Sequence, residues 1–336
     1  MPDDLILLGH GSGGALSHRL LDELVVPTLS GLSDREQNDA ALLEAGGRRL
    51  AFTTDGYVVD PPFFPGGTIG SLAVHGTVND LAMMGARPLW LSCALIIEEG
   101  FRRDSLAAIL ADLRRAADIC GVQVVTGDTK VVPRGKADRV YITTSGVGVL
   151  EHDLVIHGAN GQEGDRIILS GTMGDHGMAV MAAREGLDAG GLPSDSAPLW
   201  GLVEALMEAA GAGLHLLRDP TRGGVATTLV EIARQSGVSL SIDEAAIPIR
   251  PAVRGLCGIL GLDPLYVANE GKLVACVAPE RADEALAALR RHPAGADAAI
   301  IGVVEAGTPG RVRMRTAVGG ARVVEMLAGE QLPRIC

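Results

Sequence analysis

The stretch TIGSLAVHGTVNDLAMMGARPLWLSCALII, residues 68–97, decides the fold class that the sequence predicts. Ile69, Leu72 and Leu81 recur at helical spacing in its first part, so a helix is expected there. The short apolar run PLWLSCALII at 88–97 follows and is typical of a buried strand. A helix followed at once by a strand indicates an α/β fold.

The sequence on either side repeats this alternation in two halves. In the first half, strands are expected at 48–56, 122–128 and 139–150, and a helix is expected at 104–121. The polar, Gly-rich segment HDLVIHGANGQEGD separates the halves, and the pattern restarts after it. In the second half, strands are expected at 166–171, 273–278 and 298–305, and helices at 178–186, 199–211, 224–236 and 281–292.

These patterns predict a mixed α+β protein of two α/β domains, residues 1–152 and 153–321. The remaining segment RVVEMLAGEQLPRIC, residues 322–336, contains Gly329 and Pro333. It is expected to be a mobile C-terminal tail, because glycine and proline interrupt regular structure there.

Composition limits the function classes. The net charge of −12 argues against a nucleic-acid partner, which would need a basic face, but allows phosphate ligands held by backbone amides and magnesium-bound carboxylates. The longest apolar run, at 89–97, is too short to span a bilayer. The N-terminus lacks the cationic start and cleavage site of a signal peptide. A cytoplasmic location with no membrane partner is therefore expected.

Five cysteines are scattered along the chain with no CxxC pair, at positions 93, 120, 257, 276 and 336. This spacing argues against a zinc site and, in a reducing cytosol, against a disulfide framework. The first four lie in apolar surroundings typical of small buried residues. Cys336 differs because it is the last residue and has no apolar neighbour beyond Ile335.

Four short motifs carry an Asp at an element boundary, and in three of them the Asp stands beside Gly, Asn or Thr. They are TTDGY with Asp55, TVNDLAMMGA with Asn79 and Asp80, VTGDTKVV with Asp128, Thr129 and Lys130, and LRDPTRGG with Asp219. Each motif alone is explained by a turn or a helix cap. Together, convergent carboxylates would need a cation, and oxygen ligands suit Mg²⁺. The set indicates a metal–nucleotide site.

Two further segments carry candidate functional groups. The Gly-rich HGSGG at His10–Gly14 can approach a polyphosphate closely, although a flexible loop is the alternative, and no GxxxxGK[ST] motif of a P-loop NTPase is present. VANEGKLV, residues 267–274, places Glu270 and Lys272 before an apolar strand, and a solvated hairpin turn is the alternative there. The histidines form no constellation with Ser or Cys that would support a hydrolytic triad.

Taken together, HGSGG, FTTDGYVVDPPFFPGGTIG, AVHGTVNDLAMMGARP, GDTKVV, RDPTRGG, NEGK and the terminal LPRIC resemble the HypE family of hydrogenase maturation proteins. The resemblance runs from His10 to Cys336 with the motifs in the same order. The middle motifs are shared by a wider superfamily of ATP-using enzymes, which includes aminoimidazole ribonucleotide synthetase and thiamine monophosphate kinase. The terminal PRIC is the part specific to HypE.

The resemblance implies a two-domain PurM-like fold in which the N-terminal domains of two subunits form a shared β-barrel, giving a homodimer. It implies ATP and Mg²⁺ as cofactors, bound in the first domain. A HypF-like carbamoyltransferase that uses carbamoyl phosphate would place a carbamoyl group on Cys336. The chain would then dehydrate this thiocarboxamide to a thiocyanate with ATP. The cyano group would pass to iron on a HypC–HypD-type scaffold and become a cyanide ligand of [NiFe]-hydrogenase.

The resemblance and the chemistry together assign roles to particular residues. The catalytic candidates are Cys336 as the carrier of the substrate, Glu270 as the base, and Lys130, which binds phosphate or assists deprotonation. The ATP-binding candidates are His10, Gly11, Gly13, Gly14, Asn79, Asp80, Asp128 and Thr129. The magnesium candidates are Asp55, Asp80, Asp128 and Asp219. The alternatives are another PurM-like ATP-dependent enzyme acting on a small molecule, and a non-catalytic thiol carrier or scaffold.

Overall fold

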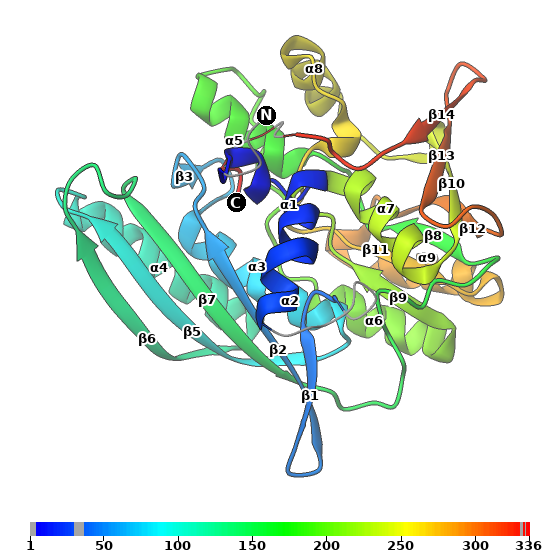
Figure 1. Ribbon diagram of the computed structural model, residues 1–336, viewed down its shortest axis with the longest axis horizontal. Coiled ribbons are helices and arrows are strands. Elements are labelled where there is room, and N and C mark those ends of the chain that lie inside the picture. The colour runs from blue at the N-terminus through cyan, green and yellow to red at the C-terminus, as the bar shows by residue number, and fades with distance from the viewer. Residues whose placement is uncertain (1–4, 30–36, 330–331, 333) are drawn as a thin grey trace.

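The computed structural model describes residues 5–29, 37–329, 332 and 334–336. Its strands form two main sheets, one in each half of the chain, with helices packed on them and between them (Figure 1). The two-domain α/β organisation expected from the sequence is confirmed. Pro333, which the sequence places in the mobile tail, lies outside the described residues.

The first sheet has five strands in the order β1-β2-β7-β5-β6. They are β1 (Ala41–Ala45), β2 (Arg48–Tyr57), β7 (Val140–Val149), β5 (Arg87–Glu98) and β6 (Gln123–Val132). Neighbouring strands are antiparallel except β5 and β6, which are parallel. Strand β6 forms one edge of this sheet, because it pairs with β5 on one side alone among the described strands. A short hairpin, β3 (Phe63–Phe64) and β4 (Gly67–Thr68), leads into the helices.

Helix α3 (Ile69–Met83) is the central helix of the molecule and is buried on almost all sides. Thr68 caps its start, because the Thr68 side chain accepts a hydrogen bond from the amide of Gly70. The helix contacts β2, β5 and β7 of the first sheet, helix α4 (Arg103–Cys120), and helix α6 (Trp200–Ala210) and strand β9 (Leu214–Arg218) of the second half. Within α3, Asp80 is the one residue that is not buried.

The second sheet has seven strands in the order β14-β13-β10-β12-β8-β11-β9. Besides β9 they are β14 (Ala321–Val324), β13 (Arg311–Arg315), β10 (Ser239–Asp243), β12 (Ala299–Glu305), β8 (Arg166–Leu169) and β11 (Val274–Val277). Its remaining helices are α5 (Asp175–Glu185), α7 (Gly224–Ser236), α8 (Pro251–Leu260) and α9 (Ala282–Arg291), with short 3-10 turns at η4 (Gly211–Gly213), η5 (Glu244–Ala246), η6 (Pro264–Tyr266), η7 (Pro279–Arg281) and η8 (Pro293–Gly295). The strands expected at 166–171, 273–278 and 298–305 and the four expected helices are all present.

Several short elements were not predicted from the sequence. They are β1, β9, β10, β13, β14, the hairpin β3–β4, helix α8 and the N-terminal helices η1 (Leu8–Gly11), α1 (Ala15–Leu20), η2 (Leu21–Val25) and α2 (Val26–Leu29). Strands of four or five residues give too little alternation to be read without their partners. Strand β14 pairs antiparallel with β13 and buries Val324, so sheet structure continues three residues into the segment expected as tail.

The N-terminal segment joins the two halves. His18 on α1 forms an ion pair with Glu231 on α7, with 2.8 Å between Nε2 and Oε1. Hydrogen bonding to Glu231 raises the pKa of His18, which favours the charged form of the pair. The amide of Ala15 donates to the carbonyl oxygen of Leu327 at 2.8 Å, so the start of α1 also contacts the segment that leads to the C-terminus. Helix α1 and the segment that leads to the C-terminus thus lie close together over the junction of the halves (Figure 1).

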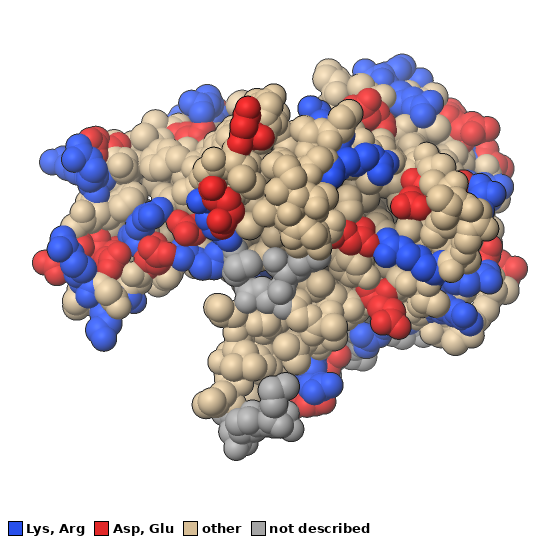
Figure 2. All heavy atoms as spheres, turned by 90° about the horizontal axis from the view of Figure 1, so that it is seen from above, with Lys and Arg blue, Asp and Glu red and all other residues tan. Residues whose placement is uncertain are grey.

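The surface shows mixed charge. On the face in Figure 2, acidic and basic side chains are interspersed, and no broad region of positive charge alone is visible. No helix within the described ranges is long and apolar enough to cross a membrane.

Candidate active site

The last three residues of the chain lie in a groove between the end of β2 and helix α5. A main-chain oxygen of each accepts a hydrogen bond: the carbonyl of Arg334 from the amide of Asp60 (3.1 Å), the carbonyl of Ile335 from Nε2 of His176 (2.8 Å) and the terminal carboxylate of Cys336 from the amide of Val58 (3.0 Å). Ile335 and Cys336 are buried, at 3% and 9% exposure. The end of a segment expected to be mobile is therefore docked in this structure, because it offers an apolar side chain and carbonyl groups to a matching groove.

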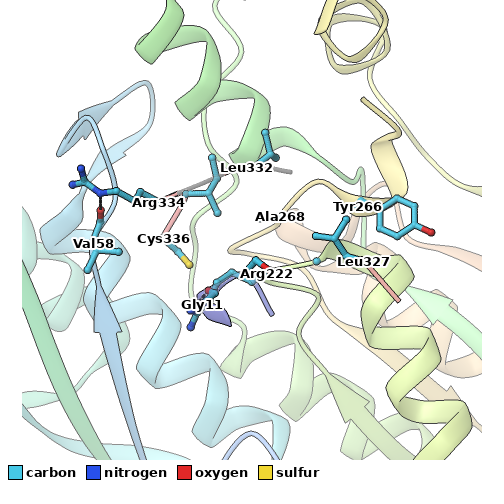
Figure 3. A pocket seen from close by; sticks show the side chains of 12 residues that line it. Gly11, Val58, Arg222, Tyr266, Ala268, Leu327, Leu332, Arg334 and Cys336 are labelled. Atoms are coloured by element: carbon cyan, nitrogen blue, oxygen red, sulfur yellow. Dashed lines mark hydrogen bonds between the residues drawn. The ribbon is translucent and has the colours of Figure 1, made fainter. Parts of the chain in front are cut away.

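The thiol of Cys336 borders a small cavity of about 50 Å³. Its lining includes Gly11, Val58, Arg222 and Tyr266 (Figure 3). Figure 3 shows the sulfur pointing toward the side of the cavity that carries Arg222 and Gly11. Since a water needs roughly 10–15 Å³, a cavity of about 50 Å³ has room for about three to five water-sized groups. A carbamoyl group, with its three non-hydrogen atoms, is small enough to fit.

Charged groups of both halves act on this thiol. Burial raises the pKa of Cys336 to about 12, the Arg222 guanidinium lowers it, and Glu270 and Asp55 raise it. Arg222 in turn lies 3.7 Å from a carboxylate oxygen of Asp55. The last cysteine, the RDPTRGG motif and the NEGK motif, which are far apart in the sequence, therefore meet at one point.

Glu270 is buried and is held through its backbone. Its amide donates to Asp195 Oδ1 at 3.1 Å, and its carbonyl oxygen accepts from Asn79 Nδ2 at 3.3 Å. Oε1 of its side chain has no hydrogen-bond partner among the described residues. Burial first, and then the carboxylates around it, raise the pKa of Glu270 well above its ordinary value. A buried carboxylate with a free oxygen is poised to take a proton from a ligand.

The loop around Glu270 is not the solvated hairpin turn that the sequence allowed. Lys272 is also buried and forms an ion pair with Asp195, at 3.0 Å between Nζ and Oδ2. A side chain at Gly271 would collide with the carbonyl oxygen of Asp195, so glycine is required there. The loop is fixed against the segment that precedes α6, and the buried charge of Lys272 is paired, whereas Oε1 of Glu270 has no partner among the described residues.

Asn79 is expected from the sequence to contact the nucleotide, and in this structure its side chain is hydrogen-bonded within the protein. Its Nδ2 donates to the carbonyl oxygens of Ala197 (3.1 Å) and Glu270, and its Oδ1 accepts from the amide of Leu199 at 2.8 Å. The amide group is thus fully used inside the protein, 1% exposed, and serves to position the Glu270 loop.

Four carboxylates act on one another at the junction of the halves, namely Asp39, Asp55, Asp80 and Asp219, and two of them, Asp55 and Asp219, also act on Glu270. Burial and then the neighbouring carboxylates raise the pKa values of Asp80 and Asp219 well above the ordinary value. Asp80 accepts a hydrogen bond from the Thr53 hydroxyl at 2.8 Å, and Asp39 pairs with Arg218 at 2.6 Å. Repulsion of this kind is relieved by a divalent cation.

No group of three or more His, Cys, Asp or Glu side chains within the described ranges is arranged to hold a metal ion. This does not conflict with a magnesium–nucleotide site. Magnesium is usually held by one or two carboxylates together with waters and the phosphates of the substrate, and not by an all-protein cage. The mutual repulsion of Asp55, Asp80 and Asp219 fits such a site.

The Gly-rich loop lies over the same junction. A side chain at Gly14 would collide with the carbonyl oxygen of Leu327, whereas a side chain at Gly11 would meet no atom within 4 Å. Arg222 Nη1 donates to the carbonyl oxygen of Gly11 at 3.1 Å, and Gly13 packs on the same arginine. The ring of His10 is hydrogen-bonded to the backbone of Leu7. In this arrangement the Gly-rich loop contacts the tail and Arg222, and open space remains beside Gly11.

Asp128, Thr129 and Lys130 are not brought to this point. They lie on the exposed edge strand β6, where Lys130 pairs with Asp128 at 2.7 Å. The largest charge effects on the pKa values of Asp80 and Glu270 come from Asp55, Asp195, Arg222 and Asp219, not from this pair. Within one chain the candidate residues therefore form two groups.

The sequence alone assigned no role in the site to Arg222, Asp39, Arg218, His176 or Asp195. Arg222 could have been found, because it stands three residues after Asp219 in the same RDPTRGG motif. His176 lies in the Gly-rich loop GTMGDHG at 171–177, but nothing in the sequence links it to Ile335. Such links depend on long-range packing.

Comparison with known proteins agrees with the geometry. The sequence model of the AIR synthase related protein N-terminal domain matches residues 37–150, and that of the C-terminal domain matches residues 162–315. Carbamoyl dehydratase HypE of Cupriavidus necator is 54% identical over 331 residues, which cover 98% of this chain and 94% of the relative.

Two solved structures are also similar over nearly their full length. A hydrogenase maturation protein HypE in complex with ATP is 50% identical with a TM-score of 0.83, covering 99% of this chain and 100% of that one. A chain of a HypE–HypF complex is 46% identical with a TM-score of 0.87, covering 92% of this chain and 99% of that one.

Proposed function

The chain belongs to the HypE family of carbamoyl dehydratases, and from this premise we propose that it dehydrates an S-carbamoyl group on its own Cys336 to a thiocyanate with ATP. The observation that carries the proposal is the position of the Cys336 thiol. It borders a cavity of about 50 Å³, which is large enough for a carbamoyl group. The charges of Arg222 and Glu270 act on it there.

The reaction balances in two steps. The carbamoyl oxygen attacks the γ-phosphorus of ATP, the bond to ADP breaks, and the nitrogen gives one proton to a base. The second nitrogen proton is then lost, the carbon–oxygen bond breaks, and phosphate leaves with the oxygen. The products are the thiocyanate, ADP and phosphate. Phosphorylation is needed because oxide itself is too poor a leaving group.

Glu270 is the proposed base. Its free Oε1 is buried near the thiol, and its raised pKa gives it a proton affinity suited to an amide nitrogen. Arg222, whose side chain is partly exposed, offers a positive charge to the oxygen on which negative charge develops. Asp195, Lys272 and Asn79 hold the Glu270 loop in place.

Asp55, Asp80 and Asp219 would hold magnesium together with the nucleotide phosphates, and Gly11 leaves space for a phosphate. Magnesium, when bound, neutralises charge on the transferring phosphoryl group. The related HypE structure with ATP supports nucleotide binding by this chain. His10, Gly13 and Gly14 then act by shaping the loop.

A second copy of the chain would complete the site. Edge strand β6 carries exposed Val124, Val125 and Val131, which a partner strand would cover. A homodimer with a β-barrel shared by the first sheets would use this edge and bring Asp128, Thr129 and Lys130 toward the other subunit's nucleotide. In that arrangement Lys130 binds phosphate or assists deprotonation.

The partners follow from the chemistry. The thiol must receive its carbamoyl group from another protein, and a relative of this chain has been solved as a HypE–HypF complex. The tail must leave the groove for that exchange, and again to pass the cyano group to iron on a HypC–HypD-type scaffold. A thiol at the very end of a chain can make such movements.

The test has two stages. The chain is first treated with a HypF-like carbamoyltransferase and carbamoyl phosphate, freed of small molecules, and then given MgATP. The C-terminal peptide should gain a carbamoyl group on Cys336 and then lose one water. A carbamoyl adduct that keeps its water would refute the dehydration, and Glu270→Gln should stop the reaction at that stage. Cys336→Ser should carry no adduct.

A further inference from the structure

The groove that holds the end of the chain, here called the tail groove, is built from residues outside the tail. Its walls are the backbone of residues 57–60, the side chains of His176 and Arg184 on α5, and Asp138. It contacts the tail through the main chain and through the side chains of Leu332, Arg334 and Ile335.

The main-chain contacts are continuous. The carbonyl oxygen of Arg334 accepts hydrogen bonds from the amide of Asp60 and from Arg184 Nη2, the latter at 2.8 Å. The carbonyl oxygen of Ile335 accepts from His176, and the terminal carboxylate accepts from the amide of Val58. Two consecutive peptide carbonyls and one oxygen of the terminal carboxylate are thus satisfied, although Arg334 has a left-handed φ of 50° and the tail is not a regular strand.

The side-chain contacts select the sequence. Ile335 is buried in an apolar cluster with Val59, Phe64 and Val180. The guanidinium of Arg334 donates to the carbonyl oxygen of Val58 at 3.0 Å and pairs with Asp138 (Figure 3 shows the first contact). Leu332 packs against this cluster and against a second apolar cluster beside it.

The groove is held in shape by contacts that do not involve the tail. The carbonyl oxygen of Ile335 can only accept, so His176 Nε2 carries a proton, and Nδ1 then accepts from the Ser194 hydroxyl at 2.8 Å. The imidazole also packs edge-on against Phe64, with 5.5 Å between ring centroids. Arg184 Nε donates to the carbonyl oxygen of Asp60 at 2.7 Å. A pre-organised groove needs little rearrangement to bind.

We propose that the tail groove is a peptide-recognition site that accepts a free peptide ending in Arg-Ile-Cys, and that the chain processes an S-carbamoyl cysteine presented in trans. Nothing in the contacts requires the peptide to be joined to residue 328. Attachment supplies effective concentration, not additional contacts. The binding step stands on the groove alone, and the dehydration of the bound peptide rests on the proposed function.

The test uses the full chain with its own tail released by the double substitution Ile335→Asp, Cys336→Ser. The probe is the peptide GEQLPRIC, residues 329–336, labelled with fluorescein at its amino end and followed by fluorescence anisotropy. The native peptide should bind saturably, and the same peptide with Ile335→Asp should bind about tenfold or more weakly, because it cannot bury the isoleucine. Absence of saturable binding, or equal binding of both peptides, would overturn the proposal.

A second measurement needs no altered chain. The unlabelled peptide with Cys336→Ser is added in excess to the native protein, and alkylation of the protein's Cys336 by iodoacetamide is measured. Displacement of the tail should speed this alkylation severalfold, and the Ile335→Asp peptide should not. An unchanged rate at peptide concentrations that saturate the released chain would contradict a shared groove.

His176 is tested as a positioning residue. His176→Ala should weaken the peptide by about three- to tenfold through loss of one hydrogen bond, and His176→Gln, which keeps a donor near the Nε2 position, should restore most of it. Asn160→Ala, in the linker between the sheets, is the matched control and should leave the affinity unchanged. Equal affinities for the Ala and Gln variants would remove His176 from the recognition site.

The chemical step separates the two proposals. The S-carbamoyl peptide, made with cyanate, is given to the tail-released chain with MgATP and should lose one water. If the peptide binds but neither it nor the chain's own carbamoylated tail loses water, the proposed function fails and the recognition site stands. If the chain dehydrates its own tail but the free peptide does not bind or does not react, the present inference fails alone.

Discussion

The groups around Cys336 have opposing effects on the pKa of its thiol. Burial and the carboxylates of Glu270, Asp55 and Asp219 favour the neutral thiol, and Arg222 favours the thiolate. The balance leaves the docked thiol protonated at neutral pH, with a pKa of about 12 in place of 9.0. A neutral thiol is a poor nucleophile, so docking protects the carrier cysteine between modifications.

We expect alkylation of Cys336 by iodoacetamide at pH 8 to be at least about tenfold faster in Ile335→Asp than in the native chain, because a released thiol regains its ordinary pKa and its access to solvent. Since the docked pKa is the higher one, docking is favoured below pH 9 and weakens as pH rises from 9.0 toward 12. Peptide mass mapping gives the rates, and the fully buried Cys276 is the internal control. Equal rates would show that the tail does not shield the thiol.

The cluster of carboxylates around Asp80 should affect the stability of the fold. We expect Asp80→Asn to raise the free energy of unfolding by about 1 kcal/mol at pH 7 without magnesium, because it removes a partly buried carboxylate from among like charges. A raised carboxyl pKa stabilises the fold below the ordinary value of 3.8 and loses that contribution as pH rises through the raised pKa. The advantage of the variant should therefore vanish near pH 3.8 and grow toward neutral pH.

Thermal melts from pH 4 to 8 measure this effect, and Asp153→Asn, on an exposed residue, is the control. Saturating MgATP should add about 2.7 kcal/mol to the native chain at 100 times its Kd and little to the variant. A variant that melts below the native chain at pH 7 without magnesium would contradict the repulsion.

At the scale of elements, the sequence could predict α3, α4 and the long strands because each carries a full period of apolar spacing. It could not predict that VANEGKLV is buried. Its Glu and Lys read as a solvated turn, and they are tolerated inside the protein because Asp195 and Asn79, from distant segments, bind the loop. Similarly, the sequence shows the motif that contains Asn79, but it does not show that the Asn79 side chain binds residues 197, 199 and 270.

We expect Asn79→Ala to lower the single-turnover rate of dehydration by about tenfold or more, because the Glu270 loop loses its anchor to α3. It should also destabilise the fold by about 1–3 kcal/mol, since it leaves the Leu199 amide and two carbonyl groups without a partner. Rapid-quench mass spectrometry of carbamoylated Cys336 gives the rate.

Asn160→Ala, which removes an asparagine bonded to the linker backbone, serves as the matched control and should keep the native rate. If Asn79→Ala is destabilised but turns over at the native rate, Asn79 is structural and does not position Glu270.

At the scale of the whole molecule, the order of elements and the two α/β halves could be predicted, and the contact between the N-terminal segment and the segment that leads to the C-terminus could not. The contacts of Gly14 with Leu327 and of Gly11 with Arg222 join residues more than two hundred positions apart. No local pattern encodes such pairings. The sequence also could not show that Asp128 and Lys130 lie apart from Glu270 within one chain. A sequence motif looks the same whether it contributes to the site of its own subunit or to that of a partner.

This separation gives the last prediction. If the site is completed by a second copy, Lys130→Met and Glu270→Gln chains should each be inactive as homodimers, while a mixed dimer should regain activity at one of its two sites. The reason is that one site of the mixed dimer combines the native Lys130 of one chain with the native Glu270 of the other. Mixing equal amounts after subunit exchange should restore about a quarter of the native dehydration, since half of the dimers are mixed and each has one intact site. The carbamoylated tail of the Lys130→Met chain, distinguished by mass, should be the one that loses water. Restoration on neither tail, with mixed dimers present by native mass spectrometry, would place both residues in the same chain's site.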